Sequence, residues 1–243
     1  MENNTNIVKD IERIVNDNKV QIIEANGRTF STKELEEILP TKHTASQLRF
    51  SDLASIVEIV KQEIDKFICP LYINIESETV VTVVSSLDTE KCREKPFCAV
   101  ADGSKFRFGS QYDYESFVIA VRSLFVQTDD TASLLEILKK VSNVDSVEVE
   151  DDGVTQKVVA SQGAMIASNL KVAPIRKLAP FRTFIEVEQP ESEFLFRLSD
   201  KNCFALHEAD GGAWRIKAKK NIRAFFESAL SEYIADGKVI VLG

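Results

Sequence analysis

The spacing of the apolar residues changes several times along this chain, and the changes come in groups. Between residues 53 and 67 apolar side chains recur every three or four positions, as on one face of a helix. Short β-branched runs follow between residues 71 and 101, and two further helical patterns lie between residues 114 and 141. Helices and strands that come in separate groups predict an α+β fold, in which antiparallel strand pairs pack with several helices.

The first 45 residues predict a separate segment of helix, hairpin and helix. Residues 7–15 have helical spacing, and Asn26-Gly27 between two strand-like runs is a strong signal for a two-residue hairpin turn. Ser31 then stands three positions before Glu34, which is the spacing of a capping box at the start of a second helix.

The last third of the chain predicts several strands followed by a long amphipathic helix over about 213–234. Residues 161–180 are small, apolar and irregular in pattern, so no element is predicted there. The predicted strands of this part are 154–160, 181–187, 194–198, 203–206 and 238–242. The predicted organisation is therefore residues 1–45, an acidic part over 46–153 and a basic part over 154–243, although the last two can form one continuous domain.

Charge is distributed unevenly along a chain whose net charge is −8, with a sequence pI near 5.0. Residues 154–223 carry twelve Lys and Arg against seven Asp and Glu, whereas residues 1–153 have a net charge of −11. Such asymmetry is typical of an anion-binding half or of two surfaces that attract each other, within one subunit or between subunits. The second interpretation predicts a homo-oligomer that weakens as salt rises.

Most catalytic patterns are missing from the sequence. The two histidines, His43 and His207, lack partners at the spacings of a nucleophile relay or a zinc site, and there is no glycine-rich phosphate loop. We therefore expect no cofactor and no metal, and we expect a protein that is not an enzyme. A carboxylate-based, metal-dependent hydrolase remains the alternative.

The cellular location is suggested by three further features. Four cysteines in 243 residues are typical of reduced thiols in a cytoplasmic protein. No apolar run reaches the roughly 18 residues that a membrane span needs, and the polar first residues are unlike a signal peptide. These features predict a cytoplasmic protein without membrane contact.

One segment with candidate binding residues places arginines among phenylalanines. Arg182 and Arg197 could clamp a phosphate or stack on a nucleobase. The alternative is a β-hairpin that packs its phenylalanines into the core, with the arginines paired to Glu186, Glu188 or Glu193. On a strand, Phe194 and Phe196 would share one face.

A second segment joins the predicted strand 203–206 to the long helix. Gly211 and Gly212 allow close approach to the helix N-terminus, which offers free N–H groups and a positive dipole to an anion. A basic stripe then follows at helical spacing: Arg215, Lys219 and Arg223. The alternative is a tight turn capped by Asp210, with Trp214 as a core anchor and the stripe in solvent.

These two segments resemble the YfdQ-like family of phage and prophage proteins. The matching runs are Pro180-Phe181-Arg182-Thr183-Phe184, Glu186-Val187-Glu188-Gln189-Pro190, Phe194-x-Phe196-Arg197 and Glu208-Ala209-Asp210-Gly211-Gly212-Ala213-Trp214. Further similarity lies at Phe30-Ser31-Thr32-Lys33 and at residues 106–109, 125–128 and 151–156, so it covers most of the chain in order. The resemblance implies a protein made in the cytoplasm of an infected or lysogenic bacterial host. It implies no site residue, because the family has no established activity.

Together these observations predict a non-enzymatic phage accessory protein that acts by binding, as a homo-oligomer, in nucleic-acid transactions such as replication or recombination. Its partners would be a second copy of the chain and DNA or RNA. One alternative is a counter-defence protein that captures a host defence protein or a nucleotide signal, and another is a structural protein of the virion.

Overall fold

The computed structural model describes residues 9, 10, 12–16, 19–32, 34, 46–103, 105–142, 146–151, 156–162, 165–172, 175–199 and 203–243. The chain divides into two compact units, Met1–Ala45 and Ser46–Gly243. The structure confirms the predicted α+β class, with mixed helices and sheets and a long C-terminal helix. The second predicted helix of the N-terminal segment lies outside the described residues.

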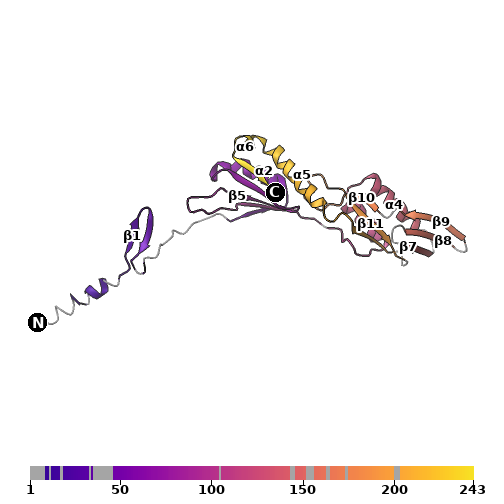
Figure 1. Ribbon diagram of the computed structural model, residues 1–243, viewed down its shortest axis with the longest axis horizontal. Coiled ribbons are helices and arrows are strands. Elements are labelled where there is room, and N and C mark those ends of the chain that lie inside the picture. Colours follow the sequence, from indigo (N-terminus) through magenta and orange to yellow (C-terminus); the bar gives the residue numbers. More distant parts are fainter. Residues whose placement is uncertain are drawn as a thin grey trace. The chain divides into compact units, whose positions relative to one another are not determined.

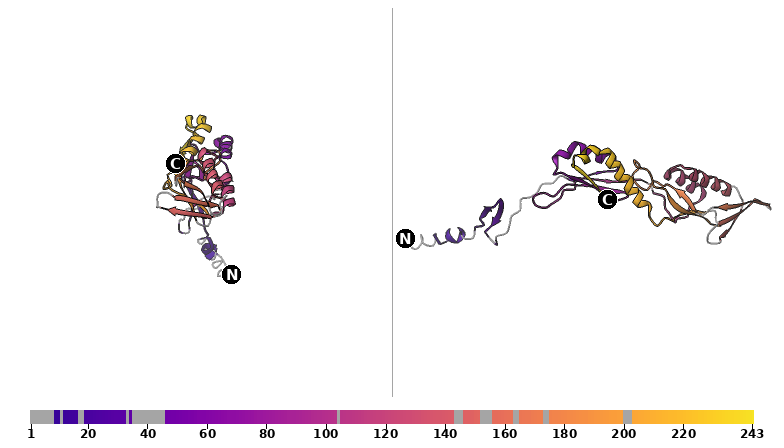
Figure 2. Two further views of the ribbon diagram at one scale, coloured as in Figure 1. Left: turned by 90° about the vertical axis from the view of Figure 1, so that its right-hand side faces the viewer. Right: turned by 45° about the horizontal axis from the view of Figure 1, so that its top comes forward.

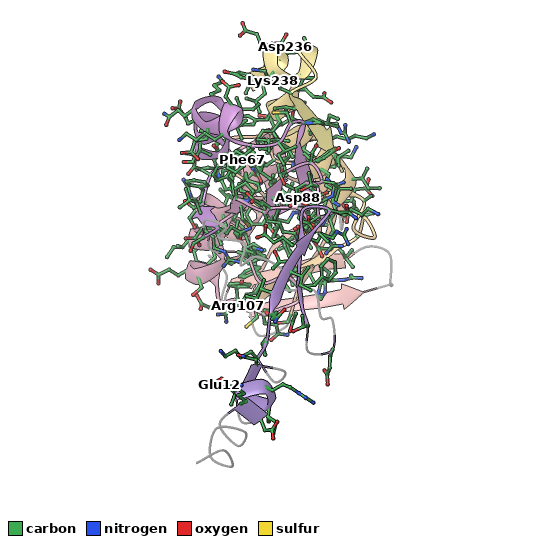
Figure 3. All side chains as sticks on the ribbon, turned by 90° about the vertical axis from the view of Figure 1, so that its left-hand side faces the viewer. Glu12, Phe67, Asp88, Arg107, Asp236 and Lys238 are labelled. Carbon is green, nitrogen blue, oxygen red and sulfur yellow. The ribbon has the colours of Figure 1, made fainter. Side chains whose placement is uncertain are left out.

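The described residues of the N-terminal unit form a short helix and a hairpin. Residues 9, 10 and 12–16 are helical, and their side chains, with Glu12 labelled, extend outward in Figure 3. Strands β1 (Ile22–Ala25) and β2 (Arg28–Ser31) pair antiparallel. Asn26 and Gly27 both have positive φ, 53° and 73°, as a two-residue hairpin turn of the mirror-image type requires. The predicted hairpin is therefore confirmed.

A five-stranded sheet with the order β13-β4-β5-β6-β3 organises one half of the larger unit. Its centre is antiparallel, whereas the edge strands β13 and β3 run parallel to β4 and β6. The strands are β3 (Leu48–Phe50), β4 (Leu71–Ser77), β5 (Val80–Val84), β6 (Phe97–Val100) and β13 (Val239–Leu242). Alternate residues of β4 and β13 are buried, which is the period of two expected for strands that are covered on one face.

Helices cover one face of this sheet (Figures 1 and 2). They are α2 (Leu53–Glu63), continued by the 3₁₀ turn η1 (Ile64–Lys66), α5 (Trp214–Ala229) and α6 (Ser231–Ala235). Their apolar faces and the sheet form a cluster that we call the sheet core, with Ile56, Ile73, Val83, Ile222 and Phe226 among its members. The long helix predicted over about 213–234 is confirmed as α5, but it ends at Ala229 and α6 follows, because Leu230 leaves helical geometry (φ −119°, ψ 22°) and is buried in the sheet core.

An ion pair ties the start of β13 to the end of η1. The Lys238 Nζ donates to Asp65 Oδ1 at 3.0 Å, and this partner raises the pKa of Lys238 above its ordinary value. Asp236, at the end of α6, lies close to Lys238 in Figure 3. Both side chains of the pair are largely exposed, so its contribution to stability is small.

The second half of the larger unit is built on a three-stranded antiparallel sheet and two helices. The strands are β10 (Ile175–Leu178), β11 (Ser192–Leu198) and β12 (Phe204–Glu208), and the helices are α3 (Tyr114–Leu124) and α4 (Asp129–Ser142). Between them lies the aromatic core, in which Phe117, Phe125, Phe194, Phe196 and Phe204 are fully buried. Neighbouring rings meet in stacked, tilted and edge-on arrangements at centroid distances of 5.6 to 6.5 Å.

A further antiparallel sheet is formed by β7 (Ser146–Asp151), β8 (Gln156–Gln162) and β9 (Met165–Val172). Strands β9 and β10 fall within residues 161–180, for which the sequence predicted no element. Pairing with β8 and with β11 fixes these two strands, and such pairing overrides a weak local pattern.

Each half of the larger unit combines residues from both of the parts that the sequence predicted. The sheet core combines residues of α2 and β4 with Phe184, Ile222 and Val239, and the aromatic core combines α3 and α4 with β11 and β12. Each core therefore contains residues from both sides of position 153. The predicted parts 46–153 and 154–243 are interleaved, as in the alternative of one continuous domain.

The segment between β10 and β11 joins the two cores, and the predicted strand over 181–187 is wrong. Instead of pairing with a strand, this loop wraps around the buried side chain of Gln189. Gln189 Oε1 accepts from the main-chain N–H of Arg182 at 3.1 Å, and Nε2 donates to the carbonyls of Phe184 and Val187 at 2.8 and 3.1 Å. One amide side chain thus satisfies main-chain groups that a sheet would otherwise pair.

The same loop caps helix α2. Glu186 Oε1 accepts from the N–H groups of Leu53 and Ala54 at 3.0 and 2.8 Å, and Oε2 accepts from Leu53 at 2.9 Å. Asp52 caps the next N–H, that of Ser55, at 2.7 Å. Two carboxylates therefore satisfy the open donors of the helix and face the positive end of its dipole.

Replacement of Glu186 by alanine should lower the free energy of unfolding by about 2 kcal/mol, because it removes charged hydrogen bonds at a helix N-terminus. The measurement is urea unfolding followed by circular dichroism. Glu188→Ala is the matched control, since Glu188 is 72% exposed and, among the described residues, its side chain pairs with the exposed Lys217. Its cost should stay within about 0.5 kcal/mol. Equal effects of the two changes would contradict the capping role.

Candidate functional site

Arg182 is at the centre of a cluster formed by the loop before β11, by β11 and β12, and by the start of α5. Its side chain is only 6% exposed, although it carries a charge. Nη1 donates to Glu208 Oε1 at 2.7 Å and Nη2 donates to Ser192 Oγ at 2.6 Å. The guanidinium carbon lies 3.9 Å from the centroid of the Trp214 ring and 5.3 Å from that of Phe194. The loop, β11, β12 and the start of α5 each contribute one wall.

Opposite charges balance each other in this cluster. Burial lowers the pKa of Arg182 below its ordinary value, and the carboxylates of Glu208 and Asp210 act in the other direction. Arginine keeps its proton at neutral pH even so, and Glu208 neutralises it. The cluster therefore offers no uncompensated positive charge to a phosphate. The partner of Arg182 is Glu208, which is not one of the three glutamates that the sequence suggested.

Arg197 does not join Arg182. On β11 the buried residues Ser192, Phe194 and Phe196 share one face, as predicted for the two phenylalanines, and Arg182 packs against that face. Arg197 is at an alternate position, so its side chain leaves the strand on the other face. The predicted clamp of two arginines is therefore not formed.

The N-terminus of α5 is closed by an acidic side chain. Gly211 and Gly212 have φ of 61° and 83°, a region that glycine enters without strain. The turn brings the N–H groups of Gly212 and Trp214 to the carboxylate of Asp210, at 3.0 and 3.1 Å. An anion bound at this helix N-terminus would need these two N–H groups, and the carboxylate of Asp210 would repel the anion. The geometry matches the alternative of a tight turn capped by Asp210.

The basic stripe of α5 lies along the five-stranded sheet. Arg215 Nε is 3.4 Å from Glu78 Oε1, and its guanidinium also lies over the Trp214 ring. Lys219 Nζ donates to the Glu76 carbonyl at 2.9 Å. Arg223 donates to main-chain oxygens of Val241 and Gly243. These contacts fasten α5 to β4 and β13, so an incoming anion would have to compete with them.

Comparisons with known proteins gave no match to a family model, to a curated protein or to a solved structure.

The described part of the chain contains no group of residues that could hold a metal ion and no disulfide. There, no three His, Cys, Asp or Glu side chains are grouped so that they could hold a metal ion. The four cysteines are free thiols, and burial raises the pKa of Cys98. None of the described helices is long and apolar enough to cross a membrane.

Two surface hollows were not suggested by the sequence. One of about 230 Å³ lies on the sheet between β13, β4 and β5, lined by Tyr72, Asn74, Val84, Arg93 and Leu242. Arg93 reaches it from the loop before β6 and lies 5.0 Å from the Tyr72 ring centroid. The other, of about 520 Å³, lies where α3 ends and α4 begins, and its charged lining contains both signs. The sequence contained one signal for the first hollow: Tyr72 alternates with buried residues of its strand, so it lies on the other face of the sheet.

Trp214→Ala should lower the free energy of unfolding by about 4 kcal/mol, because Trp214 is 6% exposed and supports Arg182. Trp214→Phe should cost much less, about 1 kcal/mol. The phenyl ring keeps the stacking surface, and the buried Nε1 that it removes has no hydrogen-bond partner among the described residues. Circular dichroism is the appropriate probe, since Trp214 is the sole tryptophan. Equal losses would contradict this expectation, because a phenyl ring at position 214 would then support Arg182 no better than a methyl group does.

Proposed function

We propose that this chain is a non-enzymatic, phage-encoded accessory protein that acts by binding, and that it associates with further copies of itself through its N-terminal unit. The observation that carries the proposal is the apolar surface of that unit. Among its described residues no apolar side chain is buried. Those that are more than two-fifths exposed are Ile14, Val15, Val20, Ile22 and Ile23.

A hairpin of this kind is not stable alone. A two-stranded sheet is marginal in water, and it gains stability when an apolar face is covered. In the register of β1 and β2, Ile23 and Phe30 are opposite each other on one face, whereas Ile22 lies on the other face with Glu24 and Thr29. Exposed apolar side chains on a marginal element of this kind mark an interaction surface.

The charge of the unit favours a second copy as the partner. Residues 1–45 contain six Lys and Arg and eight Asp and Glu, so two such units meet with little net repulsion. In a symmetric pair, each copy covers the same apolar face of the other. Association through this surface should be insensitive to salt, unlike association between the acidic and basic parts of the chain.

The phage origin is supported by the resemblance of residues 180–214 to YfdQ-like proteins. A role in nucleic-acid transactions is the second candidate, and the excess of five positive charges in residues 154–223 favours it. The contacts of Arg215, Lys219 and Arg223 with the sheet weaken it, because these side chains already have partners.

Sedimentation velocity tests the self-association of the full chain. We expect an oligomer at about 20 μM that persists at about 1 M salt, where charge–charge attraction is screened. Ile23→Asp should shift it to monomer, because the change buries a carboxylate in the interface. Lys19→Asp introduces the same side chain at an exposed polar position and should leave the oligomer intact.

Three results would contradict the proposal. They are a native chain that is monomeric, an oligomer that Ile23→Asp leaves intact, and an oligomer that dissociates as salt rises. The last result would favour the charge-driven assembly. A monomer that Ile23→Asp destabilises would mean that its own chain covers the surface.

Gel retardation with a 30-nucleotide DNA, single- and double-stranded, tests the second candidate. If the basic part binds DNA, a complex should form at 50 mM salt and weaken by more than tenfold at 200 mM, because binding releases counterions. Arg215→Glu combined with Lys219→Glu should then abolish it. We expect no retardation, since the stripe is engaged with the sheet. A salt-dependent complex that the double change removes would restore the nucleic-acid role.

A further inference from the structure

Strand β13 forms one edge of the five-stranded sheet, and half of its main-chain groups point outward. The N–H of Leu71 donates to the carbonyl of Lys238 at 2.9 Å, and Val239 is opposite Leu71 in the parallel register. In a parallel pair, alternate residues direct both N–H and C=O to the same neighbour. Lys238, Ile240 and Leu242 therefore face β4. The main-chain groups of Val239, Val241 and Gly243 point away from the sheet, where another strand could pair with them.

Such an edge needs protection, and the β13 sequence does not provide it. The strand reads Val-Ile-Val-Leu, without a charge or a proline. Ile240 and Leu242 are about two-fifths exposed. The opposite edge differs, because β3 is only three residues long and has Arg49 at its centre. Short length and a charged residue are two common ways of blocking an edge strand.

Arg223 occupies the outward oxygens of β13. From α5 its Nη1 donates to the Val241 oxygen at 3.2 Å, and Nη2 donates to the Gly243 oxygen at 2.5 Å. Glu227, one helical turn later, lies 3.6 Å from Nη1 and helps to hold the guanidinium in place. The two oxygens are two residues apart along the edge. They are the acceptors that an added strand would use, and the planar fork of arginine reaches both at once.

We propose that Arg223 prevents the β13 edge from pairing with β13 of a second copy of this chain. Two β13 strands related by a two-fold axis would run antiparallel and would exchange equivalent hydrogen bonds. Their exposed Ile240 and Leu242 side chains would meet without any charge repulsion, because the strand carries no charge. Because Ile240 and Leu242 make β13 prone to self-pairing, the edge needs a residue that blocks such pairing. This inference is independent of the proposed function, since it concerns a surface that the native chain keeps closed.

The test is Arg223→Met in the full chain, which keeps an unbranched apolar stem and removes the guanidinium donors. Sedimentation velocity at about 5 to 100 μM should show a mass at least twice that of the native chain at the same concentration. Hydrogen exchange should slow at the amides of Val239 and Val241 by tenfold or more in the assembled variant. Arg215→Met is the matched control, because Arg215 lies on the same helix and contacts Glu78 instead of β13. It should leave both quantities unchanged.

A second change distinguishes pairing at the β13 edge from non-specific association. Ile240→Lys in the Arg223→Met background adds the edge charge that β13 lacks, and it should return the mass to that of the native chain. If Arg223→Met does not fold, Arg223→Lys replaces it. Lysine keeps the charge but lacks the planar fork, so a weaker association of the same kind is expected.

The proposal is overturned if the folded Arg223 variants keep the native mass, since Arg223 would then only fasten β13 to α5. It is also overturned if association persists after Ile240→Lys, because another surface would then be responsible. An increase in mass without slower hydrogen exchange at Val239 and Val241 would also show that another surface is responsible.

Discussion

The carboxylate of Glu186 at the N-terminus of α2 is the contact on which the arrangement of the larger unit depends. It joins residues 133 positions apart in the sequence, and it places the loop between β10 and β11 against the helix that covers the five-stranded sheet. Phe184 and Val187, on either side of Glu186, are buried in the sheet core as a result. Gln189 then closes the loop through its own amide. A segment without regular structure thus links the two cores.

Buried charge has a structural role throughout this region. Arg182 is enclosed by Trp214 and Phe194 and neutralised by Glu208, and Asp210 satisfies the N–H groups at the start of α5. An ionised side chain can be buried only if a partner compensates for the lost water, and the acidic residues of this region provide that compensation for Arg182 and for the start of α5. The surfaces that remain for binding are the exposed ones, which is why the N-terminal unit carries the functional proposal.

Much of the fold could be predicted from local pattern. The hairpin at Asn26-Gly27, the helices before and after the central strands and the α+β class all follow from turn chemistry and from spacing. The prediction was wrong where a side-chain contact or a paired strand decides. Residues 181–187 alternate like a strand, yet Gln189 bonds their main chain, and β9 and β10 form from weak patterns because β8 and β11 lie beside them. The alternation pattern of a segment does not show which groups will pair with its main chain.

The candidate site shows the same division. By itself the sequence determined which residue types were available: two arginines among aromatic rings, a Gly-Gly turn behind Asp210, and a basic stripe at helical spacing. Only the tertiary structure decided what each charge faces. Glu208, Glu78 and the outward oxygens of β13 come from other elements, and they turn apparent ligand contacts into internal ones. The physical reason is that the position of a charge along the chain follows from sequence, whereas its neutralisation depends on what packs beside it.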